Sequence, residues 1–130
     1  PDRAYRIDPL ADMAERNLLF TLHSDCPVTP ISPLFSVWAA VNRITKSGEV
    51  LGPSQKIDVI TALKAMTIYG AMLNFSEGEN GSIEIGKVAD FAVLEADPTE
   101  VNPMEIKDIS VQATIIDGKV VFEKKGAIQF

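Results

Sequence analysis

The chain has 130 residues, of which 46% are hydrophobic and 23% are charged, and its formal net charge is -6. This balance excludes a disordered or fibrous protein, and the length allows one domain or parts of two. The negative charge and the lack of a basic patch argue against nucleic acid as a partner, and the apolar runs are too short to cross a membrane, which takes about 20 residues.

The first residues and the single cysteine indicate where the protein is located. The chain begins with Pro1 and has no initiator methionine, which indicates a processed protein or an excised fragment. A single cysteine, Cys26, cannot form an intrachain disulfide or a multi-cysteine zinc site. We therefore expect a reducing compartment, the cytoplasm.

A short helix and a buried strand are predicted first. Asp8 can cap a helix that has Pro9 at its first position and apolar residues at helical spacing up to Arg16. The apolar run Leu18–Leu22 follows, and it has the pattern of a strand that is buried on both faces of a parallel sheet.

Polar side chains follow that run directly, at His23, Ser24 and Asp25, before a proline-rich loop. In α/β proteins, functional residues gather at the carboxyl ends of strands. From local pattern alone, a histidine in the place of His23 is more often a hydrogen-bonded structural residue than a ligand, and Asp25 can equally form an Asx turn. Cys26 fits a small buried residue better than a nucleophile.

Further helices are expected after the loop. Apolar residues recur at helical spacing from Leu34 to Ile44, in a helix that we expect to end near Ser47-Gly48. A second helix, capped by Ser54 or Asp58, is expected to reach about Met66, and a shorter one to cover residues 68–75.

The composition changes at Ser76, where a β region begins. Four runs rich in β-branched residues predict strands at residues 82–85, 91–95, 111–116 and 119–123. Asp117-Gly118, between the last two runs, is a two-residue hairpin signal. We therefore divide the chain into a mainly helical part, residues 1–75, and a β part, residues 76–130.

Three segments of the chain resemble one enzyme family. The sequence HSDCPV at residues 23–28, with the proline-rich loop after it, resembles the segment that closes the last barrel strand in the metal-dependent amidohydrolase superfamily, and amidohydrolase family 3 in particular. The sequence GSIEIGKVADFAVL at residues 81–94, followed by Asp97-Pro98, is similar to the C-terminal β-domain of that superfamily. Residues 51–53 and 60–67 resemble the helical connection of family 3.

The resemblance implies a fold class and a reaction. The fold would be α/β plus β: residues 1–75 would hold the last helix, strand and helices of a β/α (TIM-like) barrel, and residues 76–130 the C-terminal segment of a composite β-sandwich domain. The activity would be hydrolysis of an amide or related non-peptide C–N bond through a metal-activated water. In this resemblance Asp25 is the catalytic proton-transfer carboxylate and a metal ligand, and His23 is a candidate for substrate binding or for contact with Asp25.

Cofactor and partners follow from the same resemblance. The complete enzyme would use a divalent metal, with zinc expected, and would act on a small molecule. One His and one Asp cannot provide the three or four ligands of such a site, so we expect the chain alone to be inactive and to hold no metal tightly. An unpaired edge at Leu18–Leu22 would favour self-association into a homo-oligomer. The alternative is a non-catalytic, self-associating structural or interaction module.

Overall fold

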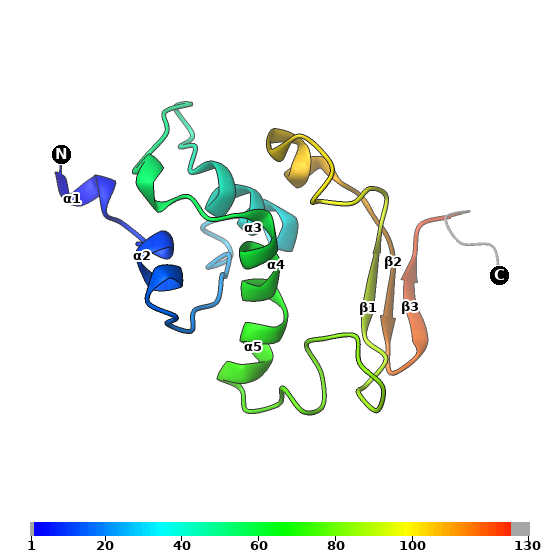
Figure 1. The fold of residues 1–130 in the computed structure, drawn as a ribbon. Helices are drawn as coiled ribbons and strands as arrows, with labels where there is room; N and C mark the ends of the chain where they lie inside the picture. The colour runs from blue at the N-terminus through cyan, green and yellow to red at the C-terminus, as the bar shows by residue number, and fades with distance from the viewer. Residues whose placement is uncertain (1, 126–130) are drawn as a thin grey trace.

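The computed structural model describes residues 2–125, and it places the helices and the strands in different parts of the chain (Figure 1). The α-helices all come before residue 75, and the strands of the three-stranded sheet all come after residue 90. The helices are α1 (Asp2–Tyr5), α2 (Leu10–Glu15), α3 (Pro33–Asn42), α4 (Val59–Met66) and α5 (Ile68–Leu73), and the strands are β1 (Phe91–Leu94), β2 (Val111–Ile116) and β3 (Lys119–Glu123). Whether the two parts are separate domains stays a prediction.

The first predicted helix is present as α2, but its capping differs from the expectation. Pro9 is the N-cap, and no side chain caps the helix, so Asp8 does not have the predicted role. Asp8 instead has a φ of 47°, in the left-handed region, and its carbonyl accepts the Leu10 N–H at 2.8 Å. The chain therefore turns sharply just before α2, and the helix begins one residue later than predicted.

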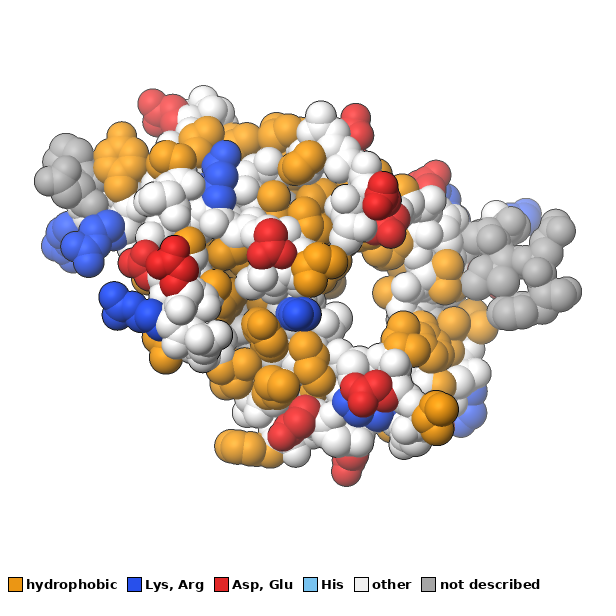
Figure 2. All heavy atoms as spheres, viewed as in Figure 1, with side chains coloured by type: hydrophobic (Ala, Val, Ile, Leu, Met, Phe, Trp, Pro, Cys, Tyr) orange, Lys and Arg blue, Asp and Glu red, His pale blue; other side chains and the backbone are white. Residues whose placement is uncertain are grey.

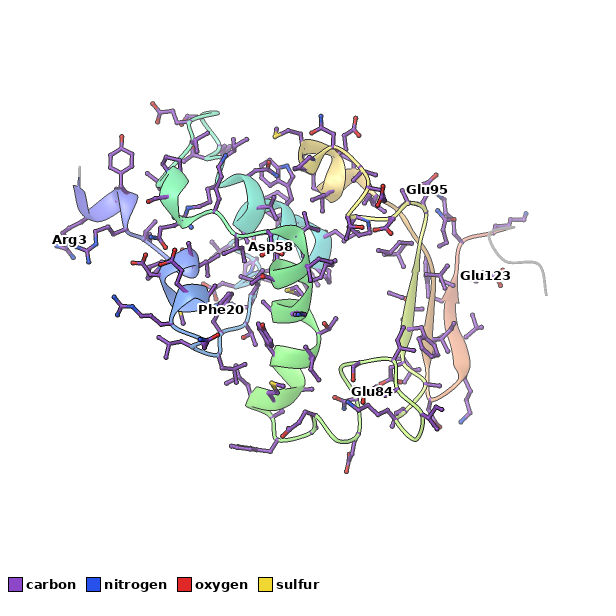
Figure 3. The ribbon with its side chains drawn as sticks, viewed as in Figure 1. Arg3, Phe20, Asp58, Glu84, Glu95 and Glu123 are labelled. Carbon is purple, nitrogen blue, oxygen red and sulfur yellow. The ribbon has the colours of Figure 1, made fainter. Side chains whose placement is uncertain are left out.

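The predicted strand at Leu18–Leu22 is wrong for the part of the chain that the structure describes. These residues form no ladder with any segment of residues 2–125. Phe20 is nevertheless buried, and its ring meets that of Tyr69 edge to face at 6.1 Å between centroids (Figure 3). The physical reason is that a strand of a parallel sheet needs neighbours that are distant in sequence, whereas one apolar side chain can be buried without them.

The two main helices have the caps that their sequences provide. The Ser32 side chain accepts the Phe35 N–H at the start of α3, and the Asp58 side chain accepts the Thr61 N–H at the start of α4. Of the two caps that the sequence allowed for α4, Asp58 is therefore the one used. α3 ends earlier than expected because Arg43 adopts the left-handed conformation directly after Asn42.

Residues 44–50 form a narrow turn in place of the expected end of α3. Ile44 and Val50 make an isolated antiparallel bridge, and Gly48 has a φ of 87° inside the turn. The Arg43 guanidinium donates to three carbonyls, those of Ile7 at 2.6 Å, Leu51 at 2.8 Å and Asp8 at 3.1 Å. These bonds join the chain on both sides of the turn to the start of α2. A short 3₁₀ helix, η1 (Pro53–Gln55), follows.

The sheet is antiparallel with the order β1-β2-β3. Asp117 and Gly118 both have positive φ, 50° and 71°, as the predicted two-residue hairpin requires. The strands predicted at 111–116 and 119–123 are present with those bounds. The strand predicted at 82–85 is wrong: this stretch consists of a bend, irregular backbone and the start of a turn, and Ile83 and Ile85 are exposed.

One element of the C-terminal part packs on the helices. The 3₁₀ helix η2 (Pro103–Asp108), which the sequence analysis did not predict, lies against α3 (Figure 1). Its Ile106 is fully buried, and the Asn42 side chain donates to the Pro103 carbonyl at 2.9 Å. The other members of this core come from residues 10–65: Leu10, Phe20, Leu34, Val37, Trp38, Ala40, Ile57, Ala62 and Ala65.

Most of the sheet stands away from the helices, and Leu94 at the end of β1 packs against the helical core. Figure 2 shows an opening between the helical part and the sheet, with hydrophobic side chains on both sides of it. On β3, Val120, Val121 and Phe122 are all exposed. Among the described residues, no helix is long and apolar enough to cross a membrane.

Candidate functional site

The candidate site is the loop of residues 23–29, between the irregular segment Leu18–Leu22 and α3. Two side chains hold the peptide group that joins Ser24 to Asp25. The His23 Nδ1 atom accepts the Asp25 N–H at 3.1 Å, and the Thr29 hydroxyl donates to the Ser24 carbonyl. Both polar atoms of this one peptide group are thus bonded to side chains of the loop.

Asp25 lies at the tip of this loop in an unusual backbone conformation. Its φ is 48°, in the left-handed region, which costs an L-residue roughly 1–2 kcal/mol unless local hydrogen bonds compensate. The Asp25 carbonyl accepts the Val28 N–H at 2.8 Å, and the Cys26–Pro27 peptide bond is cis. The carbonyl is used in the turn, so the predicted Asx turn, in which the carboxylate accepts a backbone N–H, is not what closes the loop.

The carboxylate of Asp25 faces solvent. Its residue is exposed, and within residues 2–125 no hydrogen bond or ion pair reaches its oxygens. Cys26 is also exposed, which corrects the expectation of a small buried residue. Hydrogen bonds hold the backbone of the loop, but none involves this carboxylate. It can therefore accept a proton or bind a cation without losing an existing bond.

A surface cavity of about 330 Å³ lies beside the loop, and His23 is at its edge. Asp25 does not line this cavity, so within it the two predicted site residues are not brought together. The lining is partly polar and partly apolar: Asp8, Leu10, Thr21, Leu22, His23, Thr29, Phe35, Ser36, Ala39, Ala40 and Arg43.

The residues of the loop do not by themselves fit a metal site. Nowhere in residues 2–125 do three or more His, Cys, Asp or Glu side chains gather in a way that could hold a metal ion. A zinc site in a protein needs three or four ligands, and here Asp25 offers one free carboxylate. His23 has its Nδ1 atom bonded to the Asp25 N–H. Within residues 2–125, the side chains near Asp25 therefore supply fewer ligands than such a site uses.

The carboxylates with shifted pKa values lie elsewhere and have structural roles. Although partial burial raises the pKa of Asp58, hydrogen bonds from the side chain and backbone of Thr61 hold it below its usual value. The side chain of Ser82, and then Lys87, lowers the pKa of Glu84, and the side chain and N–H of Thr99 lower the pKa of Asp97. Each of these groups caps or closes a local turn.

Thr29 is the residue of the loop that the sequence analysis missed. A usable signal was present, since Ser and Thr hydroxyls bond to nearby backbone groups in turns. What the sequence does not show is which backbone atom the hydroxyl reaches, and that atom is the carbonyl next to Asp25.

The helices and the small three-stranded antiparallel sheet of residues 2–125 are consistent with part of an enzyme of the family that the sequence resembles. The comparison with protein families agrees: the model of the amidohydrolase family matches residues 1–122. The chain belongs to the amidohydrolase family, and the resemblance of its signatures to family 3 is confirmed.

Curated relatives support this membership. The chain is 33% identical over 122 residues to N-substituted formamide deformylase from Arthrobacter pascens, covering 94% of this chain and 22% of that protein. It is 33% identical over 116 residues to the putative amidohydrolase YtcJ from Bacillus subtilis (strain 168), covering 86% of this chain and 22% of that protein. It is 37% identical over 107 residues to the protein LONG AFTER FAR-RED 3 from Arabidopsis thaliana, covering 82% of this chain and 18% of that protein.

The fold resembles the crystal structure of an amidohydrolase from Thermotoga maritima MSB8, with a TM-score of 0.67 and 24% identity. The alignment covers 88% of this chain and 26% of that one. The chain therefore spans about a fifth to a quarter of the length of the proteins that it matches.

Proposed function

We propose that this chain is the C-terminal portion of a metal-dependent amidohydrolase that hydrolyses a non-peptide C–N bond, with Asp25 as its proton-transfer carboxylate. The observation that carries the proposal is the exposed Asp25 carboxylate on a braced loop, inside a family match that covers residues 1–122. In this proposal, residues 1–75 complete a β/α barrel and residues 76–130 complete a composite β-domain.

The chemistry assigned to Asp25 is general acid and base catalysis. A divalent metal, with zinc expected, would lower the pKa of water toward neutrality, and its remaining ligands would have to come from outside the residues described here. The Asp25 carboxylate would accept the proton of the attacking water and then donate it to the nitrogen that leaves as the C–N bond breaks. A carboxylate oxygen without another hydrogen-bond partner is suited to both steps.

The substrate proposed is a small molecule with an amide-type bond. N-substituted formamides are reasonable first probes because the relative from Arthrobacter pascens is an N-substituted formamide deformylase. A homo-oligomer in the cytoplasm remains part of the proposal. Since Leu18–Leu22 forms no strand, its unpaired edge no longer supports self-association, and the exposed apolar residues Val120, Val121 and Phe122 support it instead.

The experiment is the substitution Asp25→Asn in the complete gene product, with hydrolysis of an aliphatic and an aromatic N-substituted formamide as the assay. The amide keeps the shape of the side chain but cannot accept the proton. We expect kcat to fall by about 10²- to 10⁴-fold with little change in KM, because general-base catalysis contributes about that much. Near-normal turnover with a lowered melting temperature would show that Asp25 only shapes the loop.

Asp117→Asn is the matched control. Asp117 is also exposed and also has a left-handed φ, of 50°, but it lies in the β2–β3 hairpin. Asn-Gly suits that turn as well as Asp-Gly does, so turnover and melting temperature should both stay near the wild-type values.

The alternative is a non-catalytic, self-associating module, favoured by the lack of a complete metal-ligand group in residues 2–125 and by the exposed apolar β3. Zinc analysis separates the two. We expect the complete protein to retain zinc after dialysis and this chain alone to retain little and to be inactive, because one carboxylate and one imidazole hold zinc weakly. A complete protein that neither retains metal nor hydrolyses a C–N bond would support the module.

A further inference from the structure

The peptide group between Ser24 and Asp25 is held at both of its polar atoms by side chains. His23 accepts its N–H, and Thr29 donates to its C=O. On the other side of the Asp25 Cα, the next peptide group is held through the bond from the Val28 N–H to the Asp25 carbonyl at 2.8 Å. The Cα of Asp25 thus lies between two peptide planes that are each fixed in orientation.

Fixing these two planes fixes the direction of the Asp25 Cα–Cβ bond, from which the carboxylate projects. The angle φ describes rotation about the N–Cα bond, so holding the preceding peptide and the carbonyl together sets where the Cβ projects. The left-handed φ of 48° is unfavourable for an L-residue without such local bonds. Because the carboxylate has no partner of its own among the described residues, the backbone bonds, which set the direction of the Cα–Cβ bond, are what limit where it can point.

We propose that His23 is a positioning residue that aims the Asp25 carboxylate, with Thr29 holding the opposite end of the same peptide group. This inference rests on the proposed function of Asp25, and of the two roles expected for His23, contact with Asp25 or substrate binding, it selects the first. Since Nδ1 accepts the Asp25 N–H, a neutral imidazole carries its proton on Nε2. The Nδ1 atom of the ring is therefore already hydrogen-bonded to the backbone.

The first test uses this chain itself, where His23 is the single histidine and its nuclear magnetic resonance signals need no assignment among several rings. We expect the neutral ring to be the Nε2–H tautomer alone. The measurement is a ¹H–¹⁵N correlation spectrum, recorded at a pH above which the ring signals no longer move. A mixture of the two tautomers, or the Nδ1–H form, would overturn the proposal because Nδ1 could not then be the acceptor.

Two variants test the bond from the side of Asp25. His23→Ala removes the acceptor, so the Asp25 amide should exchange its hydrogen about 2- to 10-fold faster, which corresponds to the usual net worth of one hydrogen bond. His23→Asn should restore the slow exchange, because the Asn side-chain oxygen accepts the N–H two residues later in Asx turns. An unchanged exchange rate in His23→Ala would overturn the proposal.

Thr29→Val and Thr29→Ser form a matched pair for the other end of the peptide group. Valine keeps the shape of threonine and removes the hydroxyl, whereas serine keeps the hydroxyl. We expect the valine variant to shift the Ser24 carbonyl and Asp25 amide resonances, and the serine variant to leave them near the wild-type positions. Equal shifts in both would show that the methyl group, not the hydroxyl, holds the loop.

The final test separates positioning from substrate binding in the complete protein with N-substituted formamides as probes. A positioning role predicts that His23→Ala lowers kcat by about 10-fold or more with little change in KM, since small misplacements of a catalytic group are costly, and that His23→Asn recovers most of the loss. A raised KM in both variants would overturn the proposal in favour of substrate contact. Normal turnover in Asp25→Asn would instead overturn the proposed function, whatever the His23 variants do.

Discussion

Leu18–Leu22 and Lys119–Glu123 are both short runs of the kind that forms strands, and only the second is a strand. Lys119–Glu123 pairs with β2 across the two-residue turn Asp117-Gly118, while Leu18–Leu22 pairs with nothing in residues 2–125. Composition therefore indicates a capacity for β-structure, but the presence of a second segment to pair with decides whether a strand forms.

The two runs differ in how far along the chain their partners lie. An antiparallel hairpin places its partner a few residues away, so the turn alone brings the two strands together. A parallel strand needs a crossover of a dozen residues or more, and a central one needs two such neighbours. Part of the burial expected for Leu18–Leu22 is present, since Phe20 is only 6% exposed and packs against Tyr69.

Adding the partners should turn the first run into a strand. In the complete gene product, we expect the backbone amides of residues 19–22 to be protected from hydrogen exchange on the order of 10²-fold or more over this chain alone, because ladder bonds would then close them off. The amides of Val111–Ile116 that pair within the hairpin should change far less. Strong protection of residues 19–22 in this chain alone would show that this run does not need the rest of the protein to form a strand.

The contact between η2 and α3 is the place where the C-terminal part depends on the helices. Ile106→Ala should lower the free energy of unfolding by about 2–5 kcal/mol, because it leaves a cavity where a fully buried side chain packs among Leu34, Val37 and their neighbours. Urea denaturation measures the change. Ile83→Ala is the control, since Ile83 is 83% exposed and its truncation should cost almost nothing. Equal costs at both positions would show that η2 is not docked.

The hairpin turn tests whether β3 depends on local backbone preference. Gly118→Ala should lower the free energy of unfolding by roughly 1–2 kcal/mol, because φ is 71° there, although the added methyl group makes only an ordinary contact at 3.9 Å with the Ala89 Cβ. Gly70→Ala is the control: it lies within α5, its methyl group would meet no atom within 4 Å, and it should stabilise by about 0.5–1 kcal/mol. Thermal denaturation of the two variants should give shifts of opposite sign.

The smallest effect concerns the cap of α4. Asp58→Ala should cost about 0.5–2 kcal/mol at neutral pH, measured by urea denaturation, because the Thr61 N–H loses its acceptor. Hydrogen bonds hold the pKa of Asp58 below its usual value near 3.8, so the ionised form is favoured by folding. Its stabilising contribution is therefore complete above that value and is lost as the pH falls through the lower pKa of the folded state.

Asp58→Asn sharpens this last prediction. The amide oxygen of Asn still caps the helix but does not titrate, so the stability of the wild type relative to this variant should be constant above about pH 5 and should shrink below about pH 4. A difference that grows as the pH falls would show that the sign of the shift is wrong.

The candidate site was predictable in part. The sequence placed His23 and Asp25 together after an apolar run, and the structure keeps them two residues apart on one loop with a hydrogen bond between them. The direction of that bond, from the Asp25 N–H to the imidazole, and the part played by Thr29 were not predictable. They depend on a left-handed φ at Asp25 that no residue type near it requires.

The sequence by itself determined the elements whose causes are local. The Asp58 cap, the Asp117-Gly118 turn and the strands beside that turn need only neighbours within a few residues. The tertiary structure alone decided where α3 ends, that residues 103–108 form a helix against it, and that Leu18–Leu22 stays unpaired. These outcomes depend on contacts between segments far apart in the chain, and local preference does not specify which distant surface is available to pack against.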